Sequence, residues 1–152
     1  MVLGIDPGSL NLGFALLDKK EAKSLKRLGV IEATSSKSFD QRLLELMESL
    51  SELILESEIS EIVLEEVFTG KNVQSALRLA EVRGAIRYLA AKNNLKYFEY
   101  STRVVKKSIT GNGNAKKETL KLMLENQYPV SKSAQLDATD ALALAHHHCF
   151  FT

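Results

Sequence analysis

The chain opens with an apolar run that carries one carboxylate and then breaks, and this feature constrains the fold most. Val2 to Ile5 is short and apolar, Asp6 follows it, and Pro7-Gly8 is a turn signal. The run predicts a buried strand with Asp6 at its end. A buried carboxylate needs a partner, and a cation would serve. The alternative is that Asp6 only caps the turn by accepting hydrogen bonds from the next amides.

Two further strand-like runs follow closely, at 10–17 and 24–31. Strands joined by short turns are expected to pair antiparallel. Later runs at 62–64 and 95–100 each follow a long amphipathic segment, so they should lie parallel to the first strand. The sequence thus predicts an α/β fold with a five-stranded mixed sheet, three antiparallel strands plus two parallel ones, flanked by helices.

The apolar spacing predicts five helices, which are expected over 39–57, 73–93, 102–109, 115–127 and 135–148. The expected N-cap residues of the last four helices are, in order, Asn72, Ser101, Asn114 and Ser133. The helix at 73–93 is apolar on more than one side, with small residues at Ala76, Ala80 and Gly84. One side should pack on the sheet. The other either meets a second subunit or belongs to the core of a monomer.

Composition narrows the class of protein. A chain of 152 residues is expected to form one domain over 1–152. A single cysteine, Cys149, excludes an intramolecular disulfide and is interpreted as a buried small hydrophobe. No apolar run is long enough to span a membrane, and no signal-peptide pattern follows Met1, so the expected location is cytoplasmic.

Charge is unevenly distributed, although the formal net charge is only +1. Residues 32–66 hold ten acidic and two basic side chains, whereas residues 69–121 hold twelve basic and three acidic ones. A basic half suits a polyanionic partner, because contacts with phosphates release condensed counterions. The alternative is two solvated helix faces that happen to differ in sign.

Four carboxylates are placed to converge. Asp137 and Asp140 are three apart on a helix otherwise almost free of charge, so both project from one face. Glu65 ends the strand at 62–64 and would neighbour Asp6 if the two strands pair. Oxygen ligands favour Mg²⁺ or Mn²⁺ over zinc, and paired magnesium ions catalyse phosphodiester hydrolysis. An N-terminal helix-dipole role is the alternative for the aspartate pair.

An ordered series of segments makes the prediction specific, and it covers almost the whole chain. The segments are GIDPGS, LEEVF followed by KNVQSALRLAEVRG, FEYSTRVVKKSITGNGNAKK and DATDALALA. With them the chain resembles the RuvC family of bacterial Holliday-junction resolvases, which have a ribonuclease-H-like fold. The resemblance implies a homodimer that binds four-way junction DNA, nicks two strands symmetrically in recombination and repair, and works with a branch-migration helicase.

The resemblance also implies roles for single residues. It makes Asp6, Glu65, Asp137 and Asp140 the catalytic, metal-binding set, holding two Mg²⁺ per subunit, for which Mn²⁺ would substitute. Some relatives carry histidine where Asp137 stands. The residues expected to contact DNA are Phe68, Lys106, Lys107, Lys116 and Lys117. The alternatives are a core position for the aromatic ring and ordinary solvated positions for the lysines.

Two rival functions remain open from the sequence alone. Actin-like ATPases also begin with a strand, an aspartate and a glycine turn, which would make this chain a nucleotide-binding module. A junction-binding protein without catalysis is the other. His146, His147 and His148 invite a metal interpretation, but His147 lies two helical turns from Asp140, so packing or exposure in the tail is favoured.

Overall fold

One mixed sheet organises the chain. The structure, a computed structural model, describes residues 1–21, 24–66, 72–131 and 133–152. The strands are β1 (Val2–Asp6), β2 (Asn11–Asp18), β3 (Ser24–Glu32), β4 (Glu61–Glu65) and β5 (Lys96–Tyr100). Their order is β3-β2-β1-β4-β5, with the first three antiparallel and the last two parallel to β1. The predicted five-stranded mixed sheet is confirmed.

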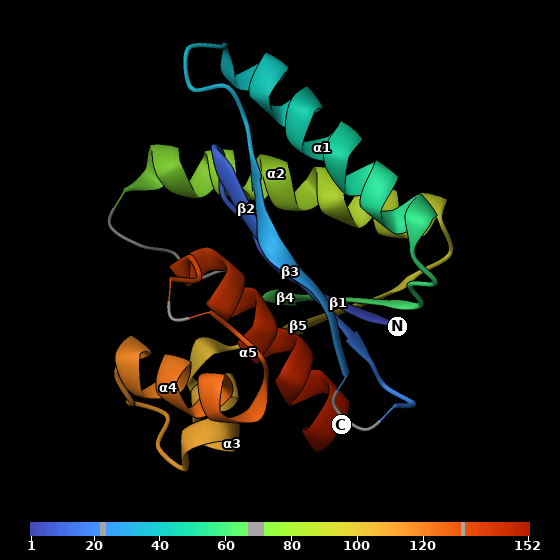
Figure 1. The fold of residues 1–152 in the computed structure, drawn as a ribbon. Coiled ribbons are helices and arrows are strands. Elements are labelled where there is room, and N and C mark those ends of the chain that lie inside the picture. Colours follow the sequence, from blue (N-terminus) through green and yellow to red (C-terminus); the bar gives the residue numbers. More distant parts are fainter. Residues whose placement is uncertain (22–23, 67–71, 132) are drawn as a thin grey trace.

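Helices cover both faces of the sheet (Figure 1). On one face lie α1 (Phe39–Glu56) and α2 (Val73–Lys92), which are the crossovers that lead to β4 and β5. On the other face lies α5 (Leu136–Phe151), with α3 (Thr102–Thr110) and α4 (Lys117–Gln127) packed beside it. In the described residues, no helix combines the length and apolarity that a membrane crossing requires.

Alternation along the strands separates two apolar cores. Leu3 and Ile5 of β1 pack with α1 and α2, whereas Val2 packs with the α5 side. On β4, Leu64 joins the first core and Val63 the second. Successive strand side chains point to opposite faces. The residues that follow Ile5 and Leu64, which are Asp6 and Glu65, therefore project toward α5.

Two glycines let α5 lie directly on the sheet. A Cβ atom at Gly4 would lie 2.1 Å from the backbone oxygen of Ala141, and one at Gly13 would lie 2.1 Å from that of Asp137. Gly13 is also the antiparallel partner of Asp6. The missing side chain at Gly13 therefore brings the first turn of α5 up to the end of β1.

Helix starts were predicted only in part. The predicted caps Asn72 and Ser101 are confirmed, because each accepts a hydrogen bond from a backbone N–H of the first turn. The predicted Asn114 cap is wrong. α4 begins at Lys117, and the backbone N–H of Asn114 instead donates to Oδ1 of Asn112, 2.9 Å away, in a local turn.

The start of α5 was also mispredicted. Gln135, not Ser133, is the N-cap residue, and the hydroxyl of Ser133 is 2.8 Å from that of Ser131. Serine side chains often bond locally in this way, and such bonds compete with capping. The helix then continues to Phe151, three residues beyond its predicted end at 148.

The three consecutive histidines lie in the last turns of α5. All three are buried. Each bonds a different part of the fold, in the pairs His146 with Tyr128, His147 with Ser108, and His148 with Tyr100 and Glu61. Packing, the favoured alternative to a metal role, is confirmed. Cys149 beside them is half-buried rather than fully buried, and burial raises the pKa of its thiol to about 11.

Candidate active site

The carboxyl ends of β1 and β4 form the floor of the site. Ile5 pairs with Leu64 in parallel register, so Asp6 and Glu65 follow at the same edge on the same face. α5 crosses this edge and adds Asp140. A cavity of about 280 Å³ is lined by these three carboxylates together with Lys106 and Lys117. Segments from β1, β4, α3, α4 and α5 thus meet at one point.

Asp6 is the electrostatic centre of this cluster. Its pKa is raised from an ordinary value of 3.8 to about 7. Burial is the largest cause, followed by the negative charges of Asp140, Asp137 and Glu65, whereas Lys117 acts in the opposite direction. The other three predicted carboxylates therefore all act on Asp6, although Asp137 does not line the cavity itself.

Two of these carboxylates are held by neighbouring side chains. Nζ of Lys117 lies 2.5 Å from Oδ2 of Asp140, and this hydrogen bond is the main reason that the pKa of Lys117 is raised. The hydroxyl of Thr102, the first residue of α3, donates to Oε1 of Glu65. The first contact joins α4 to α5, and the second joins α3 to the end of β4.

The donor set fits a hard divalent cation in its chemistry. It consists of carboxylate oxygens around a desolvated aspartate whose charge is disfavoured by three like charges. Within the described ranges, however, no three carboxylate, histidine or cysteine side chains stand close enough together to ligate one ion as they are oriented. Lys117 holds Oδ2 of Asp140, and Thr102 holds Oε1 of Glu65.

The predicted DNA-contacting lysines divide into two pairs. Lys106 and Lys117 line the cavity. Lys107 and Lys116 are exposed on α3 and at the N-cap of α4, outside that lining. Phe68 lies outside the described residues, so its predicted stacking role stays a prediction.

Sequence reasoning did not identify two residues at this edge. Thr102 had been assigned only to a helix start, yet its hydroxyl reaches Glu65. Arg83 on α2 is 6% exposed and lines a second cavity that contains Asp6 and Glu65. An arginine within a helix of little amphipathic character carries no local signal of its burial.

α2 also leaves one face uncovered. Val73, Leu77 and Tyr88 are 67%, 60% and 63% exposed. With the exposed Ala80 and Gly84 they recur at three- and four-residue spacing, which places all five on one side of the helix. We call this set the α2 stripe. At Gly84 no atom lies within 4 Å of the position of a Cβ, so this side is open to a partner.

Known proteins match the chain over nearly its whole length. The family model described as crossover junction endodeoxyribonuclease RuvC matches residues 2–148. The RuvC of Chlorobium phaeovibrioides is 41% identical over 148 residues, covering 95% of this chain and 78% of that protein. The RuvC of Bdellovibrio bacteriovorus is 36% identical over 152 residues, covering 99% and 90%.

Solved structures agree with these matches. T. thermophilus RuvC in complex with a Holliday junction substrate superposes with a TM-score of 0.90 at 25% identity, covering 99% of this chain and 93% of that one. The yeast mitochondrial Holliday junction resolvase Ydc2 superposes with a TM-score of 0.65 at 14% identity, which shows the fold alone. The predicted ribonuclease-H-like fold is confirmed.

Proposed function

The chain belongs to the RuvC family of crossover junction endodeoxyribonucleases, and from that premise we propose that it resolves Holliday junctions by symmetric, magnesium-dependent nicking of two strands. The observation that carries the mechanism is the meeting of Asp6, Glu65 and Asp140 with two lysines in one cavity. The reaction serves homologous recombination and DNA repair. The family is one of nucleases, so the actin-like nucleotide-binding alternative has no support.

We assign the four carboxylates as the residues that would hold the metal. Asp6, Glu65, Asp137 and Asp140 supply hard oxygen donors, and their mutual repulsion at Asp6 is what a divalent cation would relieve. Two Mg²⁺ per subunit would stabilise the charge on the attacking and leaving oxygens, and Mn²⁺ would substitute. Thr102 donates to Glu65 and Lys117 donates to Asp140, so an ion that binds these oxygens would displace the two donors.

The other groups of the cavity act on the DNA. The ammonium groups of Lys106 and Lys117 bind the oxygens of the phosphate to be cut, because they are the cations that line the cavity. A water molecule attacks phosphorus and the 3′-oxygen leaves, which yields a 5′-phosphate and a 3′-hydroxyl. Lys107 and Lys116, which are exposed nearby, contact the flanking backbone. Phe68 stacks on an unpaired base.

We propose a homodimer with the α2 stripe at its interface. Three large apolar side chains that stand more than half exposed on one helix face are unfavourable in water. Alanine and glycine between them permit close approach of a second helix. A twofold dimer would present two active sites to the two strands of a symmetric junction. A branch-migration helicase is the expected further partner, and the cytoplasm the expected location.

The test is cleavage of a synthetic mobile four-way junction compared with a linear duplex of the same sequence, both with Mg²⁺. We expect paired nicks in the junction only. Asp6→Asn should retain junction binding and lose cleavage. Asp40→Asn, the same change at an exposed position on α1, is the matched control and should cut normally. Cleavage by Asp6→Asn at the wild-type rate would refute the assignment. Equal cleavage of duplex and junction would refute the substrate.

A further inference from the structure

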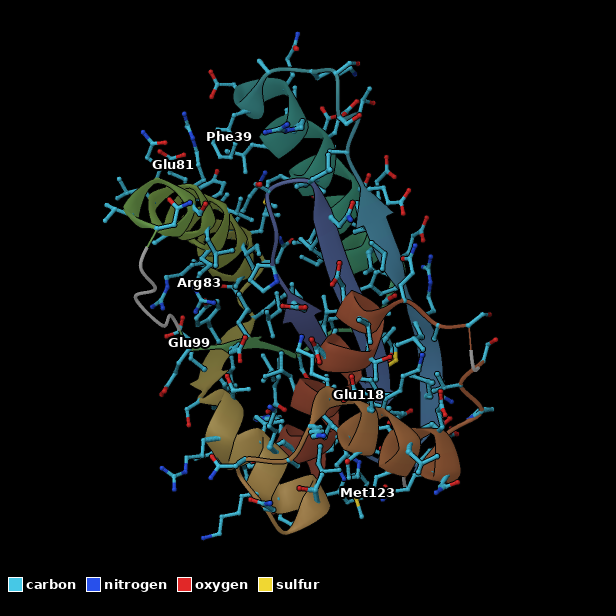
Figure 2. All side chains as sticks on the ribbon, turned by 90° about the vertical axis from the view of Figure 1, so that its left-hand side faces the viewer. Phe39, Glu81, Arg83, Glu99, Glu118 and Met123 are labelled. Carbon is cyan, nitrogen blue, oxygen red and sulfur yellow. The ribbon has the colours of Figure 1, made fainter. Side chains whose placement is uncertain are left out.

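A buried arginine lies beside the catalytic carboxylates. Arg83 is 6% exposed, and its Nη2 atom lies 2.6 Å from Oε1 of Glu99 on β5 (Figure 2). Burying a guanidinium is costly unless its charge is compensated and its donors are used. The question is therefore whether the protein alone neutralises the charge of Arg83 and accepts hydrogen bonds from all its donors, or whether a ligand does part of this.

Glu99 does not neutralise Arg83 alone. The same Oε1 atom also accepts hydrogen bonds from Nη2 of Arg87, at 3.1 Å, and from the hydroxyl of Tyr97, at 2.9 Å. Two guanidinium charges thus share one carboxylate. Arg87 is exposed to solvent and stacks over the ring of Tyr97, 4.3 Å from its centroid, so water serves its remaining donors. Arg83 has no comparable access to water.

Arg83 lines a second cavity, which adjoins the first and also contains the carboxylates of Asp6, Glu65 and Glu66. It has a volume of about 310 Å³ and is lined by Pro7, Glu66, Leu79 and Arg83 in addition to three residues of the catalytic cavity. The shared residues are Asp6, Glu65 and Thr102. The two cavities therefore adjoin at the catalytic carboxylates. Lys106 and Lys117 line the first, and Arg83 is the basic side chain lining the second.

The same edge continues beyond Arg83. A third, more open cavity of about 730 Å³ shares Pro7 and Leu79 with the second. Its lining includes Ser9, Ser75 and Arg78, and also Leu77 of the α2 stripe. Together the three cavities form one path across the carboxyl edge of the sheet. A DNA strand cut at Asp6 would have room to follow this path, and its next phosphate would pass Arg83.

We propose that Arg83 binds the phosphate adjacent to the one that is cut, on the side of the active site opposite Lys106 and Lys117. This inference rests on the proposed junction cleavage. A guanidinium suits the task because its planar donors can serve a carboxylate and a phosphate together. Glu99 then acts as a positioning residue that keeps Arg83 directed along the sheet edge. The competing interpretation makes Arg83 only a structural partner of Glu99.

The experiment couples a protein change to a DNA change. Single neutral methylphosphonates replace, in turn, each phosphate that flanks the cleavable one in a synthetic junction. Binding is measured in an Asp6→Asn background, which prevents cutting. We expect one flanking position to weaken binding about tenfold with Arg83 present, which is typical of a charge-assisted hydrogen bond. Arg83→Gln should weaken binding of the unmodified junction similarly and abolish the effect of that methylphosphonate.

Matched variants separate binding from folding. Arg87→Gln removes a guanidinium from the same Glu99 oxygen but outside the cavity, and it should leave the methylphosphonate effect intact. Arg83→Gln should also reduce the salt dependence of binding, by about one unit of log–log slope per lost phosphate contact. Arg83→Gln/Glu99→Gln removes the ion pair as a unit, so a well-folded double variant that still loses the coupling supports the proposal.

Three outcomes would overturn it. One is that the loss of binding free energy caused by Arg83→Gln simply adds to the loss caused by each methylphosphonate. Another is an equal effect of Arg83→Gln and Arg87→Gln. The third is an unchanged salt dependence of junction binding in Arg83→Gln, which would mean that no phosphate contact was lost. Wild-type cleavage of the unmodified junction is read in parallel, so a failure of the proposed function would be seen there and not mistaken for a failure at Arg83.

Discussion

Nζ of Lys117 lies 2.5 Å from Oδ2 of Asp140, so a cation carried by α4 occupies a carboxylate oxygen carried by α5. A metal ion that binds Asp140, as proposed, would therefore compete with this lysine. We predict that Lys117→Gln binds Mn²⁺ more tightly than the wild type, yet cuts junctions roughly 100-fold more slowly, because one charge that stabilises the transition state is lost. Calorimetry gives the affinity, and single-turnover cleavage gives the rate.

The control for this prediction is Lys92→Gln. Lys92 is exposed in the last turn of α2 and does not line the catalytic cavity. It should match the wild type in both measurements. Weaker Mn²⁺ binding by Lys117→Gln would show that the lysine supports the metal site instead of competing with it.

The raised pKa of Asp6 leads us to predict that stability decreases as pH rises. Its folded-state pKa of about 7 lies above the ordinary 3.8, so between these values the folded protein binds more protons than the unfolded chain. The free energy of unfolding without metal should therefore fall as pH rises from about 4 to about 7, by at most about 1.4 kcal/mol per pH unit. Urea titrations in chelator at pH 5 and pH 8 measure this.

Asp6→Asn should be more stable than the wild type at pH 8 and should lose this part of the pH dependence. Excess Mg²⁺ should narrow the difference, because it favours the ionised carboxylates. The same pH dependence in Asp6→Asn and in the wild type would mean that Asp6 is not the group that titrates in this range.

Gly13 lets β2 lie directly against the first turn of α5. A methyl group there would meet the backbone oxygen of Asp137 at 2.1 Å, and backbone cannot move aside as a flexible side chain can. We predict that Gly13→Ala destabilises the protein by about 1–3 kcal/mol and displaces the first turn of α5, with a loss of cleavage greater than the loss of junction binding.

Gly29→Ala provides a graded comparison, because the added methyl would meet only the ring of Phe14, at 3.1 Å. The melting temperature and the cleavage rate should both change less in Gly29→Ala than in Gly13→Ala. Normal cleavage by a folded Gly13→Ala protein would contradict the close packing of α5 on β2.

The α2 stripe predicts the oligomeric state. Leu77→Glu places a charge in the middle of the proposed apolar interface, so it should convert a dimer into a monomer in sedimentation experiments. Leu44→Glu on α1 is the matched control, since Leu44 is 58% exposed and Leu77 60%. The idea fails if Leu77→Glu sediments as the wild type does, or if both variants dissociate equally.

The sequence by itself determined the sheet and the carboxylate set. Strand and helix periods are local properties, and the alternation of side chains decides on which face Asp6 and Glu65 lie once the strands pair. The three-residue spacing of Asp137 and Asp140 places both on one side of α5 in the same way. Once the strands pair, this geometry brings Asp6, Glu65 and Asp140 to one cavity, whereas Asp137 stays outside its lining.

Only the tertiary structure decided how those acids are held and what else reaches them. The contacts of Lys117 with Asp140 and of Thr102 with Glu65 join residues 23 and 37 positions apart. The burial of Arg83 depends on the sheet edge above which α2 lies. The starts of α4 and α5 turned on whether Asn114 and Ser133 cap a helix or take part in a local turn. Such outcomes depend on packing between distant segments or on small differences between competing hydrogen bonds, and no local pattern of residues encodes either.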